Sequence, residues 1–207
     1  MRREQQILQA AERLFHERSF DGVGVDAIGH EAGIVGSGVY RHFSSKEEIL
    51  AALIDQAADA LLMKLAEPDP DPRSELRQLV TAHVDFAVNH ERLADIWQRE
   101  HHILQQTHQR GFLRRQRRYI DRWVACLDAC YPGHSREELL SAIRALHALM
   151  TSDTTRRTGS KAAPRLPELL TALALSAVDG LVLEGPAVEG AADPAGLTEP
   201  AGRQTAS

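Results

Sequence analysis

Residues 25–46 read VDAIGHEAGIVGSGVYRHFSSK and contain two short helical patterns separated by a glycine. Apolar residues recur about one helical turn apart over residues 25–32, which predicts a short amphipathic helix. Gly33 follows directly, and glycine suits the left-handed conformation that ends a helix and turns the chain. Val39 and Phe43, four residues apart, mark the buried side of a second helix. The stretch therefore predicts a helix-turn-helix motif.

The segments on either side of this stretch complete a three-helix unit. An apolar stripe at helical spacing predicts a support helix over residues 4–19. Ser45 is placed to cap a further helix, and Glu47 and Glu48 in the first turn of that helix favour its dipole. In helix-turn-helix proteins the second helix of the motif, here residues 36–43, enters the major groove of DNA.

Together with ILQAAERLF at residues 7–15, the stretch resembles the N-terminal domain of the TetR family of bacterial transcriptional regulators. The resemblance covers roughly the first third of the chain, and the residues that carry it are Gly33, Tyr40, His42, Phe43 and Lys46. It implies a regulator that binds double-stranded operator DNA. The DNA-binding residues that it implies are Ser37, Tyr40, Arg41, His42 and Lys46. Tyr40, His42 and Lys46 resemble phosphate contacts of the family, Ser37 is a candidate base-reading residue, and Arg41 could reach either a base or a phosphate.

The chain departs from the family pattern at two places. Gly24 stands where the family usually has a Ser or Thr that caps the second helix and also bonds phosphate. Residues 35–38, VGSG, replace the commonest family sequence Ser-Lys-Gly-Thr and remove the larger side chains that could read bases. Small residues allow the backbone to approach the groove floor closely. We therefore expect phosphate contacts with few base contacts.

The charge of the chain limits how it could bind DNA. The 207 residues carry a net charge of −5, and residues 1–50 contain six Lys or Arg and eight Asp or Glu. Binding by bulk electrostatic attraction is therefore disfavoured, and the contact must rely on cations at the contact face. We expect modest affinity for a single domain and a strong dependence on dimerisation and salt.

The composition is that of an ordinary globular protein, with 43% apolar and 26% charged residues. No apolar run approaches the roughly 20 residues of a membrane span, and the start MRREQQ lacks the apolar stretch of a secretory signal. We therefore expect a cytoplasmic protein with no membrane partner. Cys126 and Cys130 lie four residues apart on a predicted helix and are expected to be free thiols.

Helical periodicity continues along the chain and no segment alternates with a period of two, which predicts an all-α fold of about nine helices. The proline-rich residues 67–72 cannot stay helical and mark a domain boundary. We expect four segments: a helix-turn-helix DNA-binding domain at residues 1–48, a connecting helix at 49–66, a ligand-binding and dimerisation domain at 73–183, and a disordered tail at 184–207.

The helices of the third segment carry aromatic and polar residues on their inner faces. These residues fit a filled core or an apolar pocket with a few polar groups, and the sequence leaves both open. The candidate pocket residues are His83, Phe86, Trp97, Glu100, Tyr119, Trp123 and Met150.

Two clusters in this segment, one of arginines and one of histidines, have more than one interpretation. One consists of Arg110, Arg114, Arg115, Arg117, Arg118 and Arg122. It fits a solvated helix face, and it also fits a site for a phosphate-bearing effector such as an acyl-CoA. The other consists of His101, His102 and His108. Adjacent histidines on a helix point about 100° apart, so we expect partly buried or surface side chains and no metal site.

The sequence predicts a ligand-responsive repressor that binds a palindromic operator as a homodimer and is released by a small-molecule effector, either an acyl-CoA or another apolar ligand. The last two helices, residues 135–152 and 167–183, are the expected dimer contact. No hydrolytic or nucleotide-binding motif is present, so we expect no catalytic residues and no cofactor. The alternative is a helical acyl-CoA-like ligand-binding protein or enzyme that uses the Arg-rich helix 110–122.

Overall fold

The computed structural model describes residues 2–65, 67–106, 109–155 and 161–182. Within these residues it contains helices, turns and no strand, which confirms the all-α prediction. The α-helices of the described chain are α1 (Arg3–Arg18), α2 (Val25–Glu31), α3 (Gly36–Val39), α4 (Lys46–Leu62), α5 (Pro72–Asn89), α6 (Glu91–Glu100), α7 (Gln109–Cys130), α8 (Arg136–Met150) and α9 (Leu166–Val178). Short 3-10 helices occupy His101–Gln106, Ser152–Thr155 and Asp179–Leu181. The expected tail at residues 184–207 lies outside the described residues.

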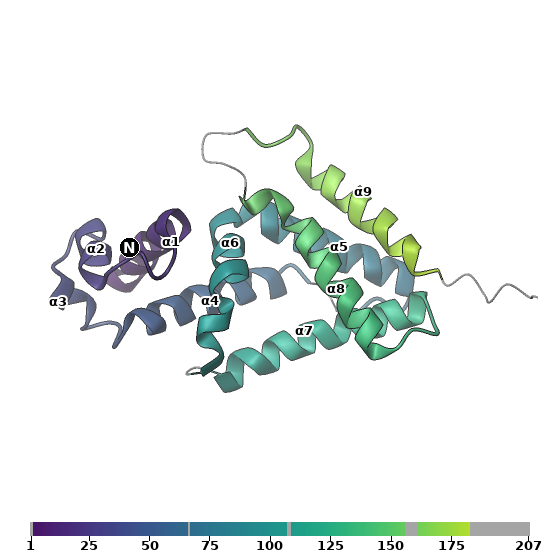
Figure 1. The fold of residues 1–207 in the computed structure, drawn as a ribbon, viewed down its shortest axis with the longest axis horizontal. Coiled ribbons are helices and arrows are strands. Elements are labelled where there is room, and N and C mark those ends of the chain that lie inside the picture. Colours follow the sequence, from purple (N-terminus) through teal and green to yellow (C-terminus); the bar gives the residue numbers. More distant parts are fainter. Residues whose placement is uncertain (1, 66, 107–108, 156–160, 183–207) are drawn as a thin grey trace, which may run out of the picture.

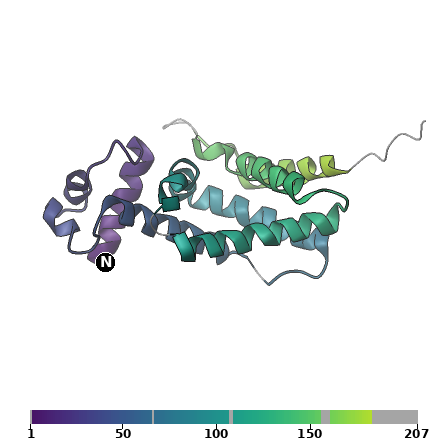
Figure 2. The same cartoon turned by 60° about the horizontal axis from the view of Figure 1, so that its bottom comes forward.

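The helices form a small head and a larger bundle (Figure 1). Helices α1, α2 and α3 lie together in the head, and α4 runs from the head into the bundle, where α5, α7, α8 and α9 pack together (Figures 1 and 2). Helix α6 contacts α1 of the head as well as α4 and α5. The head is therefore connected to the bundle through two helices, α4 and α6.

Side-chain caps fix the first residues of three helices, α4, α5 and α8. The Ser45 side chain accepts a hydrogen bond from the backbone N–H of Glu48, which confirms the predicted cap of α4. Ser135 and Glu138 form a reciprocal capping box at the start of α8. Asp71 caps α5, whose first residue is Pro72, a position that needs no backbone N–H.

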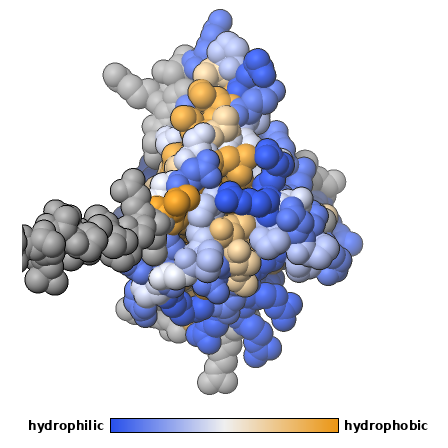
Figure 3. Space-filling model, turned by 90° about the vertical axis from the view of Figure 1, so that its right-hand side faces the viewer, coloured by the Kyte–Doolittle hydropathy of each residue, from blue (hydrophilic) through white to orange (hydrophobic). Residues whose placement is uncertain are grey.

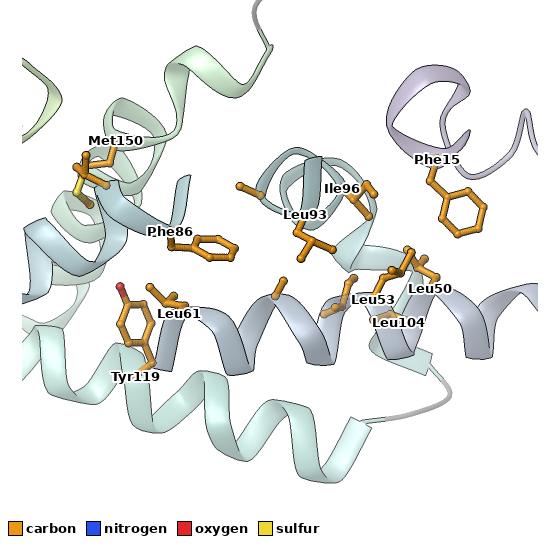
Figure 4. Packing of buried hydrophobic residues seen from close by; sticks show 14 of the residues in the cluster. Phe15, Leu50, Leu53, Leu61, Phe86, Leu93, Ile96, Leu104, Tyr119 and Met150 are labelled. Carbon is orange, nitrogen blue, oxygen red and sulfur yellow. The ribbon is translucent and has the colours of Figure 1, made fainter. Parts of the chain in front are cut away.

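A continuous hydrophobic core follows α4 from the head into the bundle (Figure 4). Leu50 and Leu53 are fully buried near Phe15 of α1 and Ile96 of α6. At the other end of α4, Leu61 lies near Phe86 and Tyr119, which come from α5 and α7.

Helix α3 is shorter than the sequence suggested. We expected a helix over residues 36–43, but α3 ends at Val39. Gly36 and Gly38 weaken the helix, because glycine is a poor helix former, and a turn follows in which the backbone N–H of His42 bonds the carbonyl of Val39 at 2.9 Å. Phe43 still lies in the core, because its backbone N–H bonds the carbonyl of Val39 at 3.1 Å across the following turn.

Candidate functional site

The helix-turn-helix motif depends on a close approach of α2 and α3. A Cβ atom built on Gly36 would lie 1.8 Å from Asp26 Oδ1, and one built on Gly29 would lie 3.1 Å from the Gly36 backbone. Gly33 between the two helices has a φ of +70°, as the predicted left-handed turn requires. The missing Cβ of Gly36 therefore serves the contact with α2, whereas the sequence alone suggested an approach to the DNA groove.

The structure brings four of the five predicted DNA contacts to one exposed region, which consists of α3 and the turn after it. The four are Ser37, Tyr40, Arg41 and His42, all of which are exposed. Val39 and Phe43 on the opposite side are buried and anchor this region to the head. The side chain of Tyr40 is 57% exposed, which is unusual for an aromatic residue and leaves it free to contact a partner.

Lys46, the fifth predicted contact, already bonds the head itself. Its Nζ donates to the backbone carbonyls of Phe20 at 2.9 Å and Val23 at 3.0 Å, and it lies 4.0 Å from the centroid of the Phe20 ring. An ammonium group has three donors, so one remains for a phosphate. Lys46 therefore holds the turn between α1 and α2 in place, and its role in DNA binding stays a prediction.

A polar contact joins α6 to the end of α1, and we call it the α1–α6 contact. Arg99 Nη2 donates to the backbone carbonyls of Phe15 and His16, both at 3.1 Å, at the C-terminal end of α1. Asp95 pairs with Arg99 at 2.6 Å and also lies 2.7 Å from His16 Nδ1. Glu100 accepts a hydrogen bond from the backbone N–H of Phe20 at 3.1 Å. A cation at a helix C-terminus is favourable, so Arg99 stabilises the docking of the head.

The α1–α6 contact also shows where Glu100 acts. The sequence placed Glu100 among the candidate pocket residues, but the structure buries it against the head. The helical pattern of the sequence shows that Glu100 faces inward. It does not show that α6 packs both on α1 of the head and on helices of the bundle.

A cavity of about 120 Å³ lies between α4, α5, α6, α7 and α8. Its described lining is largely apolar and consists of Ala57, Ala58, Leu61, Leu62, His83, Phe86, Ala94, Trp97, Gln98, Arg115, Gln116, Tyr119, Ile120, His147 and Thr151. Of the predicted pocket residues, His83, Phe86, Trp97 and Tyr119 line it. Trp123 is fully buried against His147, with ring centroids 5.2 Å apart, and Met150 lines a smaller hollow elsewhere.

A cluster of polar side chains lies at the wall of this cavity. His83 Nδ1 and Tyr119 Oη are 2.8 Å apart, and the His83 ring stacks on the His147 ring with centroids 4.3 Å apart. Burial holds the pKa of His83 well below its usual value, helped by the neighbouring His147, and burial lowers the pKa of His147 to about 4. Both imidazoles are therefore neutral at pH 7.

His147, Gln98 and Thr151 belong to this cluster and were not predicted. Thr151 Oγ1 donates to the His147 carbonyl at 2.6 Å and accepts from Gln98 Nε2. One signal was present in the sequence: His147 lies four residues after buried Ile143, so it falls on the apolar stripe of α8. A histidine at such a position marks a polar group inside the bundle.

The arginines of α7 divide into paired and exposed side chains. Arg115 pairs with Asp55 and Asp59 of α4, and Arg122 pairs with buried Glu75 through bonds of 2.5 and 3.0 Å. Arg114, Arg117 and Arg118 are exposed, and the side chain of Arg110 lies outside the described residues. Two of the six arginines thus already have carboxylate partners inside the protein. They are less available to a phosphate, which argues against the hypothesis of a phosphate site on α7.

The other cluster singled out from the sequence is that of His101, His102 and His108. His101 Nδ1 lies 2.9 Å from the carbonyl of Trp97, His102 is exposed, and His108 lies outside the described residues. In the described part of the chain, no three His, Cys, Asp or Glu side chains are placed to hold a metal ion. Cys126 and Cys130 are free thiols, and burial raises the pKa of Cys126 to about 12. None of the described helices is long and apolar enough to cross a membrane.

Sequence comparison identifies the head. A family model described as bacterial regulatory proteins, tetR family, matches residues 7–53. The HTH-type transcriptional activator FasR of Mycolicibacterium smegmatis is 34% identical over 84 residues, which are 39% of this chain and 38% of that protein. The match to this curated relative thus spans little more than a third of its length.

Structural comparison covers most of the chain. The ketosteroid transcriptional regulator KstR2 of Mycobacterium tuberculosis superposes with a TM-score of 0.73 at 21% identity, over 88% of this chain and 96% of that one. AibR, in a complex with isovaleryl coenzyme A and operator DNA, superposes with a TM-score of 0.70 at 15% identity, over 83% and 97% of the two chains. At these identities the likeness shows a shared fold. The match to the tetR family of bacterial regulatory proteins is therefore a property of residues 7–53, and the remaining described chain shares the fold of these regulators.

Proposed function

We propose that the protein is a ligand-responsive transcriptional repressor that binds a palindromic operator as a homodimer and is released by a small molecule in the cavity. The observation that carries this proposal is the double role of α6. One side of α6 lines the cavity with Ala94, Trp97 and Gln98, and another side holds the head through Arg99 and the α1–α6 contact. A ligand that moves α6 would therefore also move the head.

In this proposal the exposed region of α3 and the turn after it contacts the operator. Tyr40 and His42 bind phosphate, Arg41 binds phosphate or a base edge, and Ser37 reads a base in the major groove. The third donor of Lys46 adds a phosphate contact. The family assignment of residues 7–53 and the exposure of these side chains support these roles.

The dimer is proposed to form through α8 and α9. Leu169 and Leu173 of α9 are 47% and 48% exposed, and a hollow between the two helices is lined by apolar residues that include Leu149 and Leu181. Figure 3, which faces the bundle end of the molecule, shows a strip of hydrophobic residues between hydrophilic ones. A two-fold contact of this kind would place two heads on the two halves of a palindrome.

Release by the ligand is proposed as a population shift. The head is held by α4 and α6, and both line the cavity, so a ligand favours one spacing of the two heads over another. An occupied state that fits adjacent major grooves poorly lowers operator affinity. A typical coupling of roughly 5- to 150-fold is expected.

The first experiment tests DNA recognition. DNA enriched from a random pool by the full chain is titrated in mobility-shift assays, and the enriched sequence should bind at least about 1,000-fold tighter than a scrambled one. Equal affinity for the two sequences contradicts the proposal. The double variant Leu169→Glu, Leu173→Glu should sediment as a monomer and lose most of this affinity.

The second experiment tests the coupling through α6. A ligand is first found by screening for release of the enriched DNA. The Arg99→Met variant should still bind this ligand and should still bind the DNA, but the ligand should no longer release the DNA from it. Arg77→Met is the matched control, because Arg77 is exposed on α5 and does not line the cavity. If Arg99→Met responds to the ligand as the parent chain does, the α1–α6 contact is not the route. A ligand that strengthens DNA binding would contradict release of the operator by the ligand.

A further inference from the structure

We propose that the cavity binds a compact, uncharged ligand with an alkyl or aromatic body and a single hydroxyl or carbonyl oxygen. This inference rests on the proposed function and goes beyond it by naming the chemical class of the effector. Three properties of the cavity support it: its volume, the charge of its wall, and an unpartnered polar atom of His147.

The volume limits the enclosed part of a ligand to about the size of one ring. A dry cavity of 150 Å³ in another protein holds benzene, so the cavity of about 120 Å³ accommodates roughly six to eight non-hydrogen atoms. Ala57, Ala58 and Ile120 give the wall an apolar surface, and Phe86 and Trp97 add aromatic faces. The body of the ligand is therefore apolar.

The charge of the wall disfavours an ionised ligand. His83 and His147 are neutral at pH 7, because burial holds the pKa of each below its usual value. Arg115 is the one Lys or Arg in the described lining, and its guanidinium is shared by Asp55 and Asp59. A carboxylate in the cavity would thus meet the negative charge of two carboxylates that already hold Arg115. An uncharged ligand avoids the cost of burying an unpaired ion.

Two polar atoms of lining residues remain to be satisfied, and one is Nε of Arg115, an N–H that could donate to a ligand oxygen. The other, Nε2 of His147, is buried and has no hydrogen-bond partner, whereas His83 already bonds Tyr119. A neutral imidazole nitrogen accepts from a hydroxyl or donates to a carbonyl, according to its tautomer. A ligand with one such oxygen would supply the partner that His147 lacks.

The test compares molecules of the same shape that differ in charge. Calorimetry and ligand-observed NMR on the full chain at pH 7.5 would use 4-methylpentan-2-one and the carboxylate 3-methylbutanoate, in which an ionised oxygen replaces the methyl group beside the carbonyl. The ketone should bind at least about tenfold tighter than the carboxylate.

Variants locate the binding. Ala58→Leu fills the cavity and should weaken ketone binding at least about tenfold, whereas Ala125→Leu, the same change on the exposed face of α7, should leave it unchanged. His147→Phe removes Nε2 and should abolish the preference for the ketone over the hydrocarbon 2-methylpentane.

Three results would overturn the inference: carboxylate binding as tight as that of the ketone, ketone binding that survives Ala58→Leu, and no ketone binding up to about 10 mM. None of these readouts requires DNA, so a chain that fails to select an operator would disprove the regulator while leaving the ligand class decided. Conversely, DNA release by an ionised ligand would retain the regulator and refute the class.

Discussion

The first half of α4 is packed on all sides, whereas the second half borders the cavity. Ile49, Leu50 and Leu53 are fully buried in the core that joins the head to α6. Two turns later the chain has Ala57 and Ala58, whose small side chains help to leave a space of about 120 Å³. One helix therefore carries a filled core at the head and an unfilled one in the bundle. A filled core keeps the exposed region of α3 and the turn after it in one shape. An unfilled core leaves room for an effector to bind.

The largest effect should come from emptying the filled half. Leu53→Ala should lower the free energy of unfolding by about 3 kcal/mol, because a fully buried leucine loses its contacts and leaves a new cavity. Leu61→Ala should cost only about 1 to 2 kcal/mol, since Leu61 already faces empty space and has fewer contacts to lose. Urea unfolding of both variants measures the difference. Equal losses would mean that the cavity end of α4 is as tightly packed as the head end.

The next effect is the loss of stability at acidic pH, which depends on His147 at the cavity. The pKa of His147 is lowered to about 4 in the folded chain, so between pH 6.5 and 4 the unfolded chain binds a proton there that the folded chain does not. The stability that neutral His147 contributes is fully present above pH 6.5 and is lost as the pH falls towards 4. The full loss is roughly 3 kcal/mol at most for this shift, and His83 adds to it in the same direction.

His147→Phe should therefore flatten the dependence of unfolding free energy on pH between 7 and 4. The same substitution at exposed His102 is the control for loss of an imidazole as such. An unchanged slope in His147→Phe would show that His147 binds a proton equally well in the folded and the unfolded chain.

A smaller effect distinguishes two cations of the head. Lys46→Met should lower the free energy of unfolding by about 2 kcal/mol, because it removes the charged donor from the carbonyls of Phe20 and Val23. Arg41→Met should change stability by less than about 0.5 kcal/mol and lower DNA affinity, with a salt slope smaller by about 1. If Lys46→Met weakens DNA binding with no loss of stability, Lys46 acts mainly as a phosphate contact.

The smallest effect tests the turn of the motif. Gly33→Ala should cost about 1 kcal/mol, because its φ of +70° is strained for any residue with a Cβ although the space around it is open. Gly180→Ala is the matched control, since the space there is equally open and its φ is not positive. Thermal unfolding of the two variants should differ, and identical melting temperatures would remove the conformational argument for Gly33.

The sequence indicated these features to different degrees because they depend on contacts of different range. The turn at Gly33, the cap at Ser45 and the all-α fold follow from local chemistry and periodicity, and they were predicted. The pairing of Arg115 with α4, the docking of Glu100 on the head and the position of His147 at the cavity depend on residues far apart in the chain. Helical periodicity tells which side of a helix is buried but not which partner covers it.

The positions of the two tryptophans have a practical consequence. The chain contains two, and both belong to the bundle: Trp97 lines the cavity and Trp123 lies behind it against His147. The head contains no tryptophan. The exposed aromatic residue in the turn after α3 is Tyr40. Intrinsic tryptophan fluorescence excited near 295 nm would therefore report events at the cavity, with little direct signal from the head. Effector occupancy and operator release could be followed at the same time in one unlabelled protein, with the label placed on the DNA.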